Sequence, residues 1–446
     1  MRAPRRTARL AAAGLALTFA LTACSSGSSD DSSAPTTDST TAGEKVNLDF
    51  WTWAPNMDKV VALWNEENPD IQVTVNKQDG GDGAMTKFLT AIKAGSGAPD
   101  LMQAEYQVIP TLVSSDALAD ISGYVTDETK ADFAEGVWNS VTLGTDAVYS
   151  IPQDAGPMMF FYRADVFKDL GIDVPTTWDE YADAARKIHE ADSDVYLGTF
   201  SANDAGWFTG LATQAGASWW SMDASAGSWG VHVDEEPTQK VAKYWGDLVE
   251  EGVINNKPMY TPEWNAALND GTEVGWLSAV WAPGVLSGNA PDTAGKWEVA
   301  AMPQWDASSP ATGSWGGSST AVSTQSKHPD AAAKFATWLN TDPDAVAAMV
   351  KEAGIYPASL SASTSALTEA PEFFSNQPDF YTVAAEVSAT TKSFTFGPNV
   401  NTAYSAYKDE FGKATEKKSS SAFLEAVTNI QKIVVDDMTN TGFTVK

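Results

Sequence analysis

The stretch 151-IPQDAGPMMFFYRADVFKDLGIDVPTTWDEY-181 decides the fold, because a polar crossing segment in it leads directly into an α/β unit. The crossing is PQDAGP, where two prolines and a glycine favour a fixed backbone path. Thr177 and Glu180 then have the spacing of a capping box, which predicts a helix from this point. Its inward-facing residues are expected to be Trp178, Tyr181, Ala185 and Ile188.

A first α/β unit precedes this stretch. The segments 46–53 (VNLDFWTW), 71–75 (IQVTV) and 99–105 (PDLMQAE) are rich in strand-forming residues. Helical spacing of apolar residues separates them in 55–70 and 83–95. Strands that alternate with helices predict a parallel sheet with helices on both faces.

The remaining chain contains further elements of the same kind. We expect later strands in 273–284 and 297–305, a helix over 330–340 with Phe335, Trp338 and Leu339 buried, and mostly helix over 399–440. About 400 residues exceed what a single core usually supports, so two lobes are expected.

The N-terminal segment is typical of an exported protein. Residues 1–9 are basic, residues 10–23 are apolar but too short to span a membrane, and Leu21-Thr22-Ala23-Cys24 resembles the lipobox of bacterial lipoproteins. The resemblance implies cleavage after residue 23 and a lipid on Cys24, which is the only cysteine of the chain. Residues 24–45 are polar and would form a flexible tether. An ordinary signal peptide with an incidental cysteine is the alternative.

The charge and the residue counts exclude several kinds of function. The formal net charge of −30 would become −34 after loss of the signal peptide, which argues against nucleic-acid partners. Three histidines and one cysteine leave little basis for a metal site or a nucleophilic triad, and no cofactor is expected. The 17 tryptophans, by contrast, are unusually many.

Several motifs in order resemble one family. They are the lipobox and tether, LDFWTW, GSGAPDLMQAE, the 151–181 stretch, AGWFTGLATQAG and GSWGGSSTAVSTQSKHPDAAAKFATWL. Together they resemble the extracellular solute-binding proteins of carbohydrate ABC importers, the group that includes maltose-binding protein. The resemblance implies a two-lobe, periplasmic-binding-protein-like α/β fold in which each lobe is a mainly parallel sheet flanked by helices, with one sugar held between the lobes.

The resemblance also implies how the chain is divided and with what it interacts. Lobe 1 would comprise 46–155 plus 316–368, and lobe 2 would comprise 156–315 plus 369–446, with hinges near 154–157 and 313–317. The partners would be a mono- or oligosaccharide, the permease subunits of an importer, and the membrane, reached through lipid on Cys24. The protein would be a monomer on the outer face of the cell membrane.

Sugar chemistry selects the candidate ligand-binding residues. Aromatic planes cover the C–H faces of a sugar ring, and carboxylates, amides and backbone groups pair with its hydroxyls. Ligands in open α/β sheets lie beyond the carboxyl ends of strands. The candidates at strand ends, helix starts and crossings are Trp53, Asn56, Glu105, Tyr106, Asp154, Asp204, Trp207, Trp281, Trp315, Gly316, Gly317 and Asn399.

Other tryptophans have simpler explanations. Trp64, Trp178 and Trp338 lie at helical spacing and are expected in the core. Trp219, Trp220 and Trp229 lie in 218–230, which is either an outer lip of the cleft or a surface hairpin.

Two other classes of protein remain open. A secreted glycosidase also combines tryptophans with acids, although Glu235-Glu236 and Glu250-Glu251 are sequence neighbours that would not face one substrate together. A polysaccharide-binding adhesin would bind insoluble glycan without closing around a short sugar. The favoured hypothesis is a binding protein without catalysis that delivers a sugar to an importer.

Overall fold

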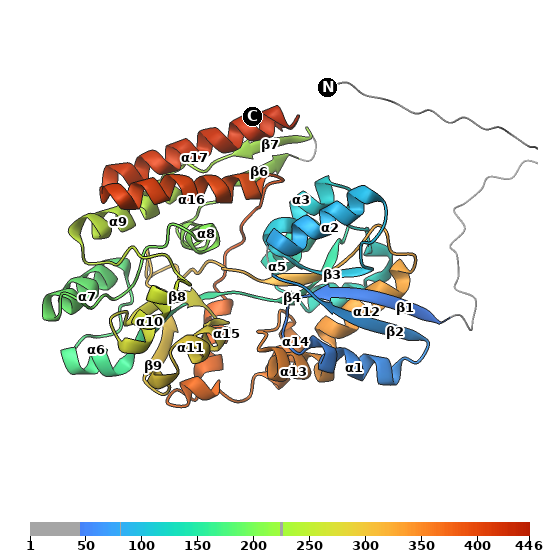
Figure 1. Cartoon of the computed structure of the whole chain (residues 1–446), viewed down its shortest axis with the longest axis horizontal. Helices are drawn as coiled ribbons and strands as arrows, with labels where there is room; N and C mark the ends of the chain where they lie inside the picture. The colour runs from blue at the N-terminus through green and yellow to red at the C-terminus, as the bar shows by residue number, and fades with distance from the viewer. Residues whose placement is uncertain (1–44, 81, 224–225) are drawn as a thin grey trace, which may run out of the picture. The chain divides into compact units, whose positions relative to one another are not determined.

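The first of the sheets has five strands in the order β2-β1-β3-β10-β4. Strands β1 to β4 of this sheet are labelled in Figure 1. A computed structural model describes residues 45–80, 82–223 and 226–446, so the predicted signal peptide, Cys24 and nearly all of the tether lie outside the described residues. The strands are β1 (Val46–Thr52), β2 (Ile71–Lys77), β3 (Leu101–Glu105), β4 (Ser150–Asp154) and β10 (Ser318–Val322). Only β10 runs antiparallel to its neighbours, as expected for a mainly parallel sheet.

The helices beside this sheet, together with it, form what we call the first domain. They are α1 (Met57–Glu67), α2 (Asp82–Ala94), α3 (Ile109–Ser114), α4 (Asp127–Ala131), α5 (Glu135–Thr142), α12 (Pro329–Thr341), α13 (Pro343–Ala348) and α14 (Leu360–Ala366). Phe50 of β1 packs on Phe335 of α12 at 5.8 Å between ring centroids, and Trp64 of α1 contacts the same ring at 5.5 Å. The strands and helices predicted from 46 to 105 are confirmed.

The second sheet differs from the prediction. It contains β5 (Met158–Arg163) between β8 (Gly275–Ala279) and β9 (Trp297–Ala301), and both pairings are antiparallel. The prediction of a mainly parallel sheet is therefore wrong for this lobe. The reason is the direction of the chain: β5 leaves the crossing at Met158, while β8 and β9 both run back toward it, with Ala279 and Ala301 beside the start of β5.

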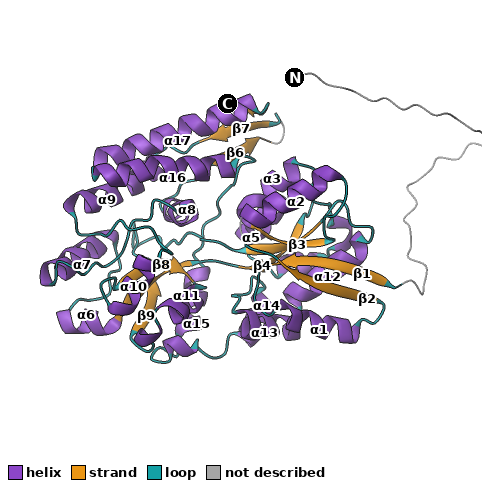
Figure 2. Ribbon diagram, viewed as in Figure 1, coloured by secondary structure: helices purple, strands orange, loops and turns teal. Residues whose placement is uncertain are grey.

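The second sheet, the helices around it and a small third sheet form the second domain. The helices are α6 (Ala164–Leu170), α7 (Trp178–Ala191), α8 (Ala205–Gln214), α9 (Glu236–Glu251), α10 (Pro262–Asp270), α11 (Ala282–Asn289), α15 (Phe380–Ser388), α16 (Val400–Lys417) and α17 (Ser420–Asn440). The third sheet has the order β11-β7-β6, from β6 (Trp220–Asp223), β7 (Ser228–Val231) and β11 (Thr444–Val445). Figure 2 shows that helices make up most of this domain.

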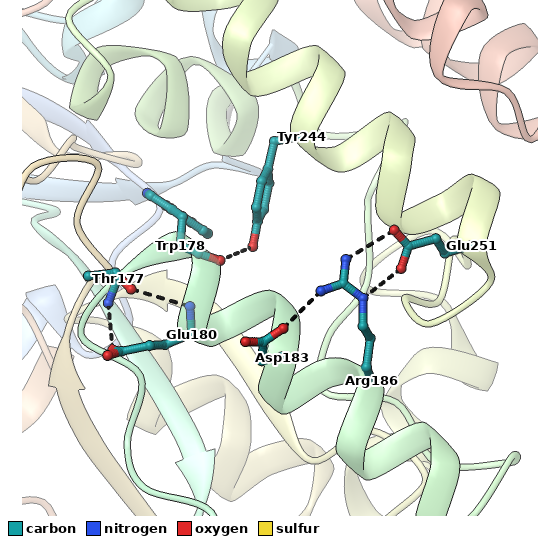
Figure 3. A network of polar contacts seen from close by, with 7 residues as sticks. All are labelled: Thr177, Trp178, Glu180, Asp183, Arg186, Tyr244 and Glu251. Carbon is teal, nitrogen blue, oxygen red and sulfur yellow. Dashed lines mark hydrogen bonds and ion pairs between the residues drawn. The ribbon is translucent and has the colours of Figure 1, made fainter.

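Helix α7 begins as its sequence predicts. The Thr177 side chain accepts from the Glu180 backbone N–H, and the Glu180 carboxylate accepts from the Thr177 backbone N–H (Figure 3). Further along, Arg186 makes two hydrogen bonds, of 2.8 and 3.0 Å, to Glu251 of α9. The Tyr244 hydroxyl of α9 also donates to the Trp178 carbonyl, so the two helices are tied at both ends of their contact.

Most tryptophans are used for packing. Those exposed by 2% or less are Trp64, Trp178, Trp207, Trp219, Trp220, Trp245, Trp264, Trp276 and Trp297. All of these except Trp64 belong to the core of the second domain. In the segment 218–230, strands β6 and β7 pair antiparallel, as a hairpin would. Trp219 and Trp220 are fully buried, however, which leaves only Trp229 of the three partly exposed.

Two segments that cross between the domains run side by side. The Met158 N–H donates to the Gly313 carbonyl at 2.9 Å, and the Trp315 N–H donates to the Gly156 carbonyl at 2.8 Å. A Cβ on Gly156 would lie 2.2 Å from the Trp315 carbonyl oxygen, so glycine is required there. These are the predicted hinge segments, and domain boundaries at 155/156 and 315/316 remain a prediction.

One acid lies deep in the core of the second domain. Glu273, just before β8, is 1% exposed and its Oε1 lacks a hydrogen-bond partner, while Oε2 accepts from Asn255 at 3.4 Å. Burial raises the pKa of Glu273 to about 8, against smaller opposing effects of Asn255 and Lys257. The side chain is therefore a neutral acid at neutral pH.

The burial of Glu273 predicts that the free energy of unfolding depends on pH. Because the folded pKa lies above the unfolded one, the native state holds the extra proton, and stability present below about pH 4.5 is lost as pH rises through 8. We expect Glu273→Gln to gain stability relative to wild type by up to about 1.4 kcal/mol for each pH unit in this window. Urea unfolding at pH 5 to 9 measures the difference, and a constant difference would contradict it.

Candidate ligand-binding cavity

A cavity of about 950 Å³ lies among the ends of elements of both domains. Its volume is within the range of small-molecule sites. The residues with polar side chains or aromatic rings in its lining include Glu105, Tyr106, Gln107, Glu135, Asn139, Asn203, Asp204, Thr209, Trp315, Lys392, Phe394, Phe396, Asn401, Tyr404 and Lys408. They come from the end of β3, the helices α5, α8 and α16, the second crossing, and the segment 388–396.

Trp315 lies at the junction of the crossing with this cavity. It is 6% exposed, and its carbonyl accepts from Trp281 Nε1 at 2.9 Å. The Trp281 and Trp315 rings meet edge to face, with 4.7 Å between centroids. Gly316 and Gly317 follow with φ of 77° and 96°, a left-handed conformation that favours glycine. Trp315 therefore lines the cavity although most of its indole is packed against other rings.

Asp204 is the acid beside this indole. It is the N-cap of α8, where its Oδ1 accepts from the Trp207 backbone N–H at 2.9 Å. Burial raises the pKa of Asp204 to about 6, while hydrogen bonds from the Trp207 backbone and the Trp315 side chain oppose the shift. The sequence places a capping acid in front of a helix, and the fold turns it toward the cavity.

A second polar group ends β3. Glu105 Oε2 accepts from Gln107 at 2.8 Å, and the Tyr106 hydroxyl donates to the Asp154 carbonyl at 2.8 Å. Asp154 itself accepts from the backbone and side chain of Ser318, which joins β4 to β10. Glu105 therefore faces the cavity, while Asp154 supports the strand beside it.

The predicted residues divide into two groups. Glu105, Tyr106, Asp204, Trp315 and Gly316 line the cavity. The others, which do not line it, are Trp53, Asn56, Asp154, Trp207, Trp281, Gly317 and Asn399.

Two of these residues make structural contacts in the core, and as ligand contacts they stay predictions. Trp207 is 1% exposed and its Nε1 donates to the Leu277 carbonyl at 2.9 Å, so its ring belongs to the core. Asn399 is 9% exposed and its amide nitrogen donates to Val434 and Asp437, so it ties α16 to α17. Helical position alone did not reveal which face these residues occupy.

Four more predicted residues do not line the cavity. The Trp53 ring packs on Gly80, and Asn56 is exposed and donates to the Glu352 carbonyl at 2.8 Å. Trp281 is half-buried behind Trp315, and Gly317 is so close to Tyr106 that a Cβ would lie 2.7 Å from its ring. These residues remain predictions as ligand contacts.

The expected order of burial between two tryptophans is reversed. Trp338, predicted to be a core residue, is half-buried and packs on Trp64 at 5.2 Å between centroids. Trp315, predicted to be an accessible plane, is mostly buried among aromatic rings. Removing Trp315 would therefore disturb the fold as well as the cavity.

Sequence reasoning missed the contributions of α5, α16 and the 388–396 segment. Glu135, Asn139, Lys392, Asn401 and Lys408 lie on these elements, and nothing in their local patterns distinguishes them from solvated surface residues. Only the packing of chain segments hundreds of residues apart brings them to one cavity.

Among the described residues, no group of three or more His, Cys, Asp or Glu side chains could hold a metal ion. No helix in the same part of the chain is long and apolar enough to span a bilayer.

The two-domain fold with a cavity among both domains defines a periplasmic-binding-protein-like molecule. The model of the bacterial extracellular solute-binding protein family matches residues 51–346. The chain belongs to this family.

Individual relatives and solved structures agree with this assignment. The arabinooligosaccharide-binding protein of Bacillus subtilis is 22% identical over 406 residues, which cover 87% of this chain and 89% of the relative. The arabinooligosaccharide-binding protein of Halalkalibacterium halodurans is 25% identical over 303 residues, or 65% of this chain and 66% of the relative.

The solved structures cover nearly the whole chain. The galacto-N-biose-/lacto-N-biose I-binding protein of an ABC transporter from Bifidobacterium longum, in complex with lacto-N-biose, has a TM-score of 0.80 at 29% identity, covering 91% of this chain and all of that one. An ABC-transporter-associated binding protein from B. animalis subsp. lactis, in complex with β-1,6-galactobiose, has a TM-score of 0.77 at 29% identity, covering 90% and 100%.

The effect of the Trp315 side chain on Asp204 predicts a measurable change in the pKa of that carboxyl. The indole N–H stabilises the charged carboxylate, so Trp315→Phe should raise the pKa of Asp204 above about 6. Carbon-13 NMR of the side-chain carboxyl measures it. Trp297→Phe is the matched control, because that buried indole donates to the Thr293 hydroxyl, outside the cavity lining, and should leave the Asp204 titration unchanged. A similar titration in all three proteins would contradict the assignment.

Proposed function

We propose that this protein captures a sugar, in particular an oligosaccharide, between its two domains and delivers it to the permease of an ABC importer. The observation that carries the proposal is the Trp315–Asp204 pair at the wall of a cavity of about 950 Å³. A sugar needs an apolar surface for its ring and charged or amide partners for its hydroxyls. The cavity offers both within one lining.

The relatives support the same ligand class. Two relatives are named for arabino-oligosaccharides, and two similar structures hold lacto-N-biose and β-1,6-galactobiose. These are neutral sugars with several hydroxyls, which match the amide and carboxylate side chains of this cavity.

Our proposal is a binding protein that does not cleave the sugar. Three acids of the pairs that suggested a glycosidase have structural partners: Glu235 pairs with His232, Glu250 accepts from the Ser420 backbone and Glu251 accepts from Arg186. Glu105, Glu135 and Asp204 in the cavity are the acids that a hydrolase would need to use.

The binding proposal is tested with arabino-oligosaccharides, lacto-N-biose, β-1,6-galactobiose, lactose and malto-oligosaccharides. A matching sugar at about 100 times its Kd should stabilise the folded protein by about 2.7 kcal/mol, seen as a higher melting temperature. Chromatography of the sugar after incubation with the protein should show that it has not been cleaved. Asp204→Asn keeps an acceptor at the α8 N-cap but removes the charge, and should bind about tenfold more weakly in calorimetry. No stabilisation by any sugar would overturn the proposal, and turnover abolished by one acid substitution would indicate a glycosidase.

Capture between domains also requires a change in shape. A ligand that contacts both domains favours the closed arrangement, so the matching sugar should lower the radius of gyration in solution scattering. An unchanged scattering curve at saturation would favour the adhesin alternative instead.

We further propose that lipid on Cys24 anchors the protein at the outer face of the cell membrane. The lipobox-like Leu21-Thr22-Ala23-Cys24 supports this proposal. Cys24→Ser should leave folding and sugar binding unchanged and release the protein from the envelope, as measured by fractionation and immunoblotting. A mutant retained in the membrane fraction would mean that residues 10–23 act as a stable membrane segment.

A further inference from the structure

Tyr260 lies in the loop between α9 and α10, which is built onto the loop that leads to Asp204. The Phe200 N–H donates to the Asn255 carbonyl at 2.7 Å, and the Asn203 amide donates to the Met259 carbonyl at 3.2 Å. Asn203 itself lines the cavity. Tyr260 is therefore held at a defined position beside the second-domain wall of the cavity.

The backbone of Tyr260 is strained. Its φ is 64°, a left-handed conformation that a bulky side chain seldom adopts. The other non-glycine residues described with positive φ are Asn56, Asp116, Leu143 and Lys418. Asn and Asp tolerate this region, and Leu143 and Lys418 are helix C-caps, where it is common. Tyr260 has neither explanation, and such strain tends to persist where function requires a side chain.

The ring of Tyr260 ends a row of packed aromatic residues. It contacts Trp264 at 5.6 Å, Trp276 at 6.3 Å and Trp315 at 6.3 Å between centroids. These three tryptophans are at most 6% exposed, whereas Tyr260 is 43% exposed. Tyr260 is not itself among the residues that line the cavity. It is the accessible member of the row and packs against Trp315, which does line it.

The phenol is also near enough to Asp204 for the charge of that carboxylate to act on it. Burial on its packed side, followed by the charge of Asp204, raises the pKa of Tyr260 well above its ordinary value. The hydroxyl therefore stays protonated and can donate a hydrogen bond at neutral pH.

We propose that Tyr260 contacts the bound sugar, its ring covering a C–H face next to Trp315 and its hydroxyl pairing with a sugar oxygen. The inference rests on the proposed function and adds a residue that sequence reasoning did not single out. It accounts for three observations together: the aromatic side chain of Tyr260 is exposed, its backbone is strained, and its ring packs against Trp315. The competing explanation is structural, since Tyr260 precedes the α10 N-cap Thr261 and packs on Trp264.

Replacement by glycine separates the two explanations. Tyr260→Gly relieves the left-handed strain and removes the ring, so a ligand role predicts about tenfold weaker sugar binding without a lower melting temperature. A purely structural role predicts a lower melting temperature and wild-type affinity. Lys418→Gly is the matched control, because it relieves a similar φ of 48° at an exposed helix end outside the cavity lining. It should leave sugar affinity unchanged.

A second measurement does not depend on the stability of a variant. In hydroxyl-radical footprinting of the wild-type protein, the tightest-binding sugar of the panel should protect Tyr260 but not Tyr124, which is 50% exposed and lies outside the cavity lining. Wild-type affinity of Tyr260→Gly, or equal labelling of Tyr260 with and without that sugar, would overturn the inference alone. Failure of wild type to bind any sugar of the panel would overturn the proposed function and the inference with it.

Discussion

The close approach of the two crossing segments at Gly156 and Trp315 is the constraint on which the cavity depends. The backbone hydrogen bond between them is 2.8 Å long, and no side chain fits on Gly156. This contact fixes the main chain of Trp315, whose carbonyl then accepts from Trp281 and whose side chain lowers the pKa of Asp204 against the effect of burial. A single backbone contact therefore orients both the apolar and the charged part of the cavity wall.

The second domain explains the unusual number of tryptophans. Its central sheet has only three strands, and large helices surround it. Indole rings fill the wide spaces between these layers, as where Trp245 contacts Trp178, Trp207 and Phe200. Because each buried ring removes a large apolar area from water, these residues contribute mainly to stability. Only a few of the aromatic residues remain for recognition.

The cavity region keeps several features that oppose stability. Asp204 is an acid whose charge is partly desolvated, and Tyr260 has a left-handed backbone. Each costs free energy in the folded protein, on the order of 1–3 kcal/mol for a strained backbone. The surrounding core offsets these costs, and the strained and desolvated groups are held in place before a ligand arrives. Such preorganisation lowers the entropy lost on binding.

Local sequence was sufficient for the elements and for the family. Apolar periodicity placed β1 to β3 and their helices, and the capping box placed the start of α7. These features depend on neighbours within a few residues, so the local sequence pattern is enough to predict them. The direction of β8 and β9, the burial of Trp207 and the exposure of Tyr260 depend instead on contacts between distant segments. The cavity joins residues from 105 to 408, and only the packed chain decides which of their side chains face it.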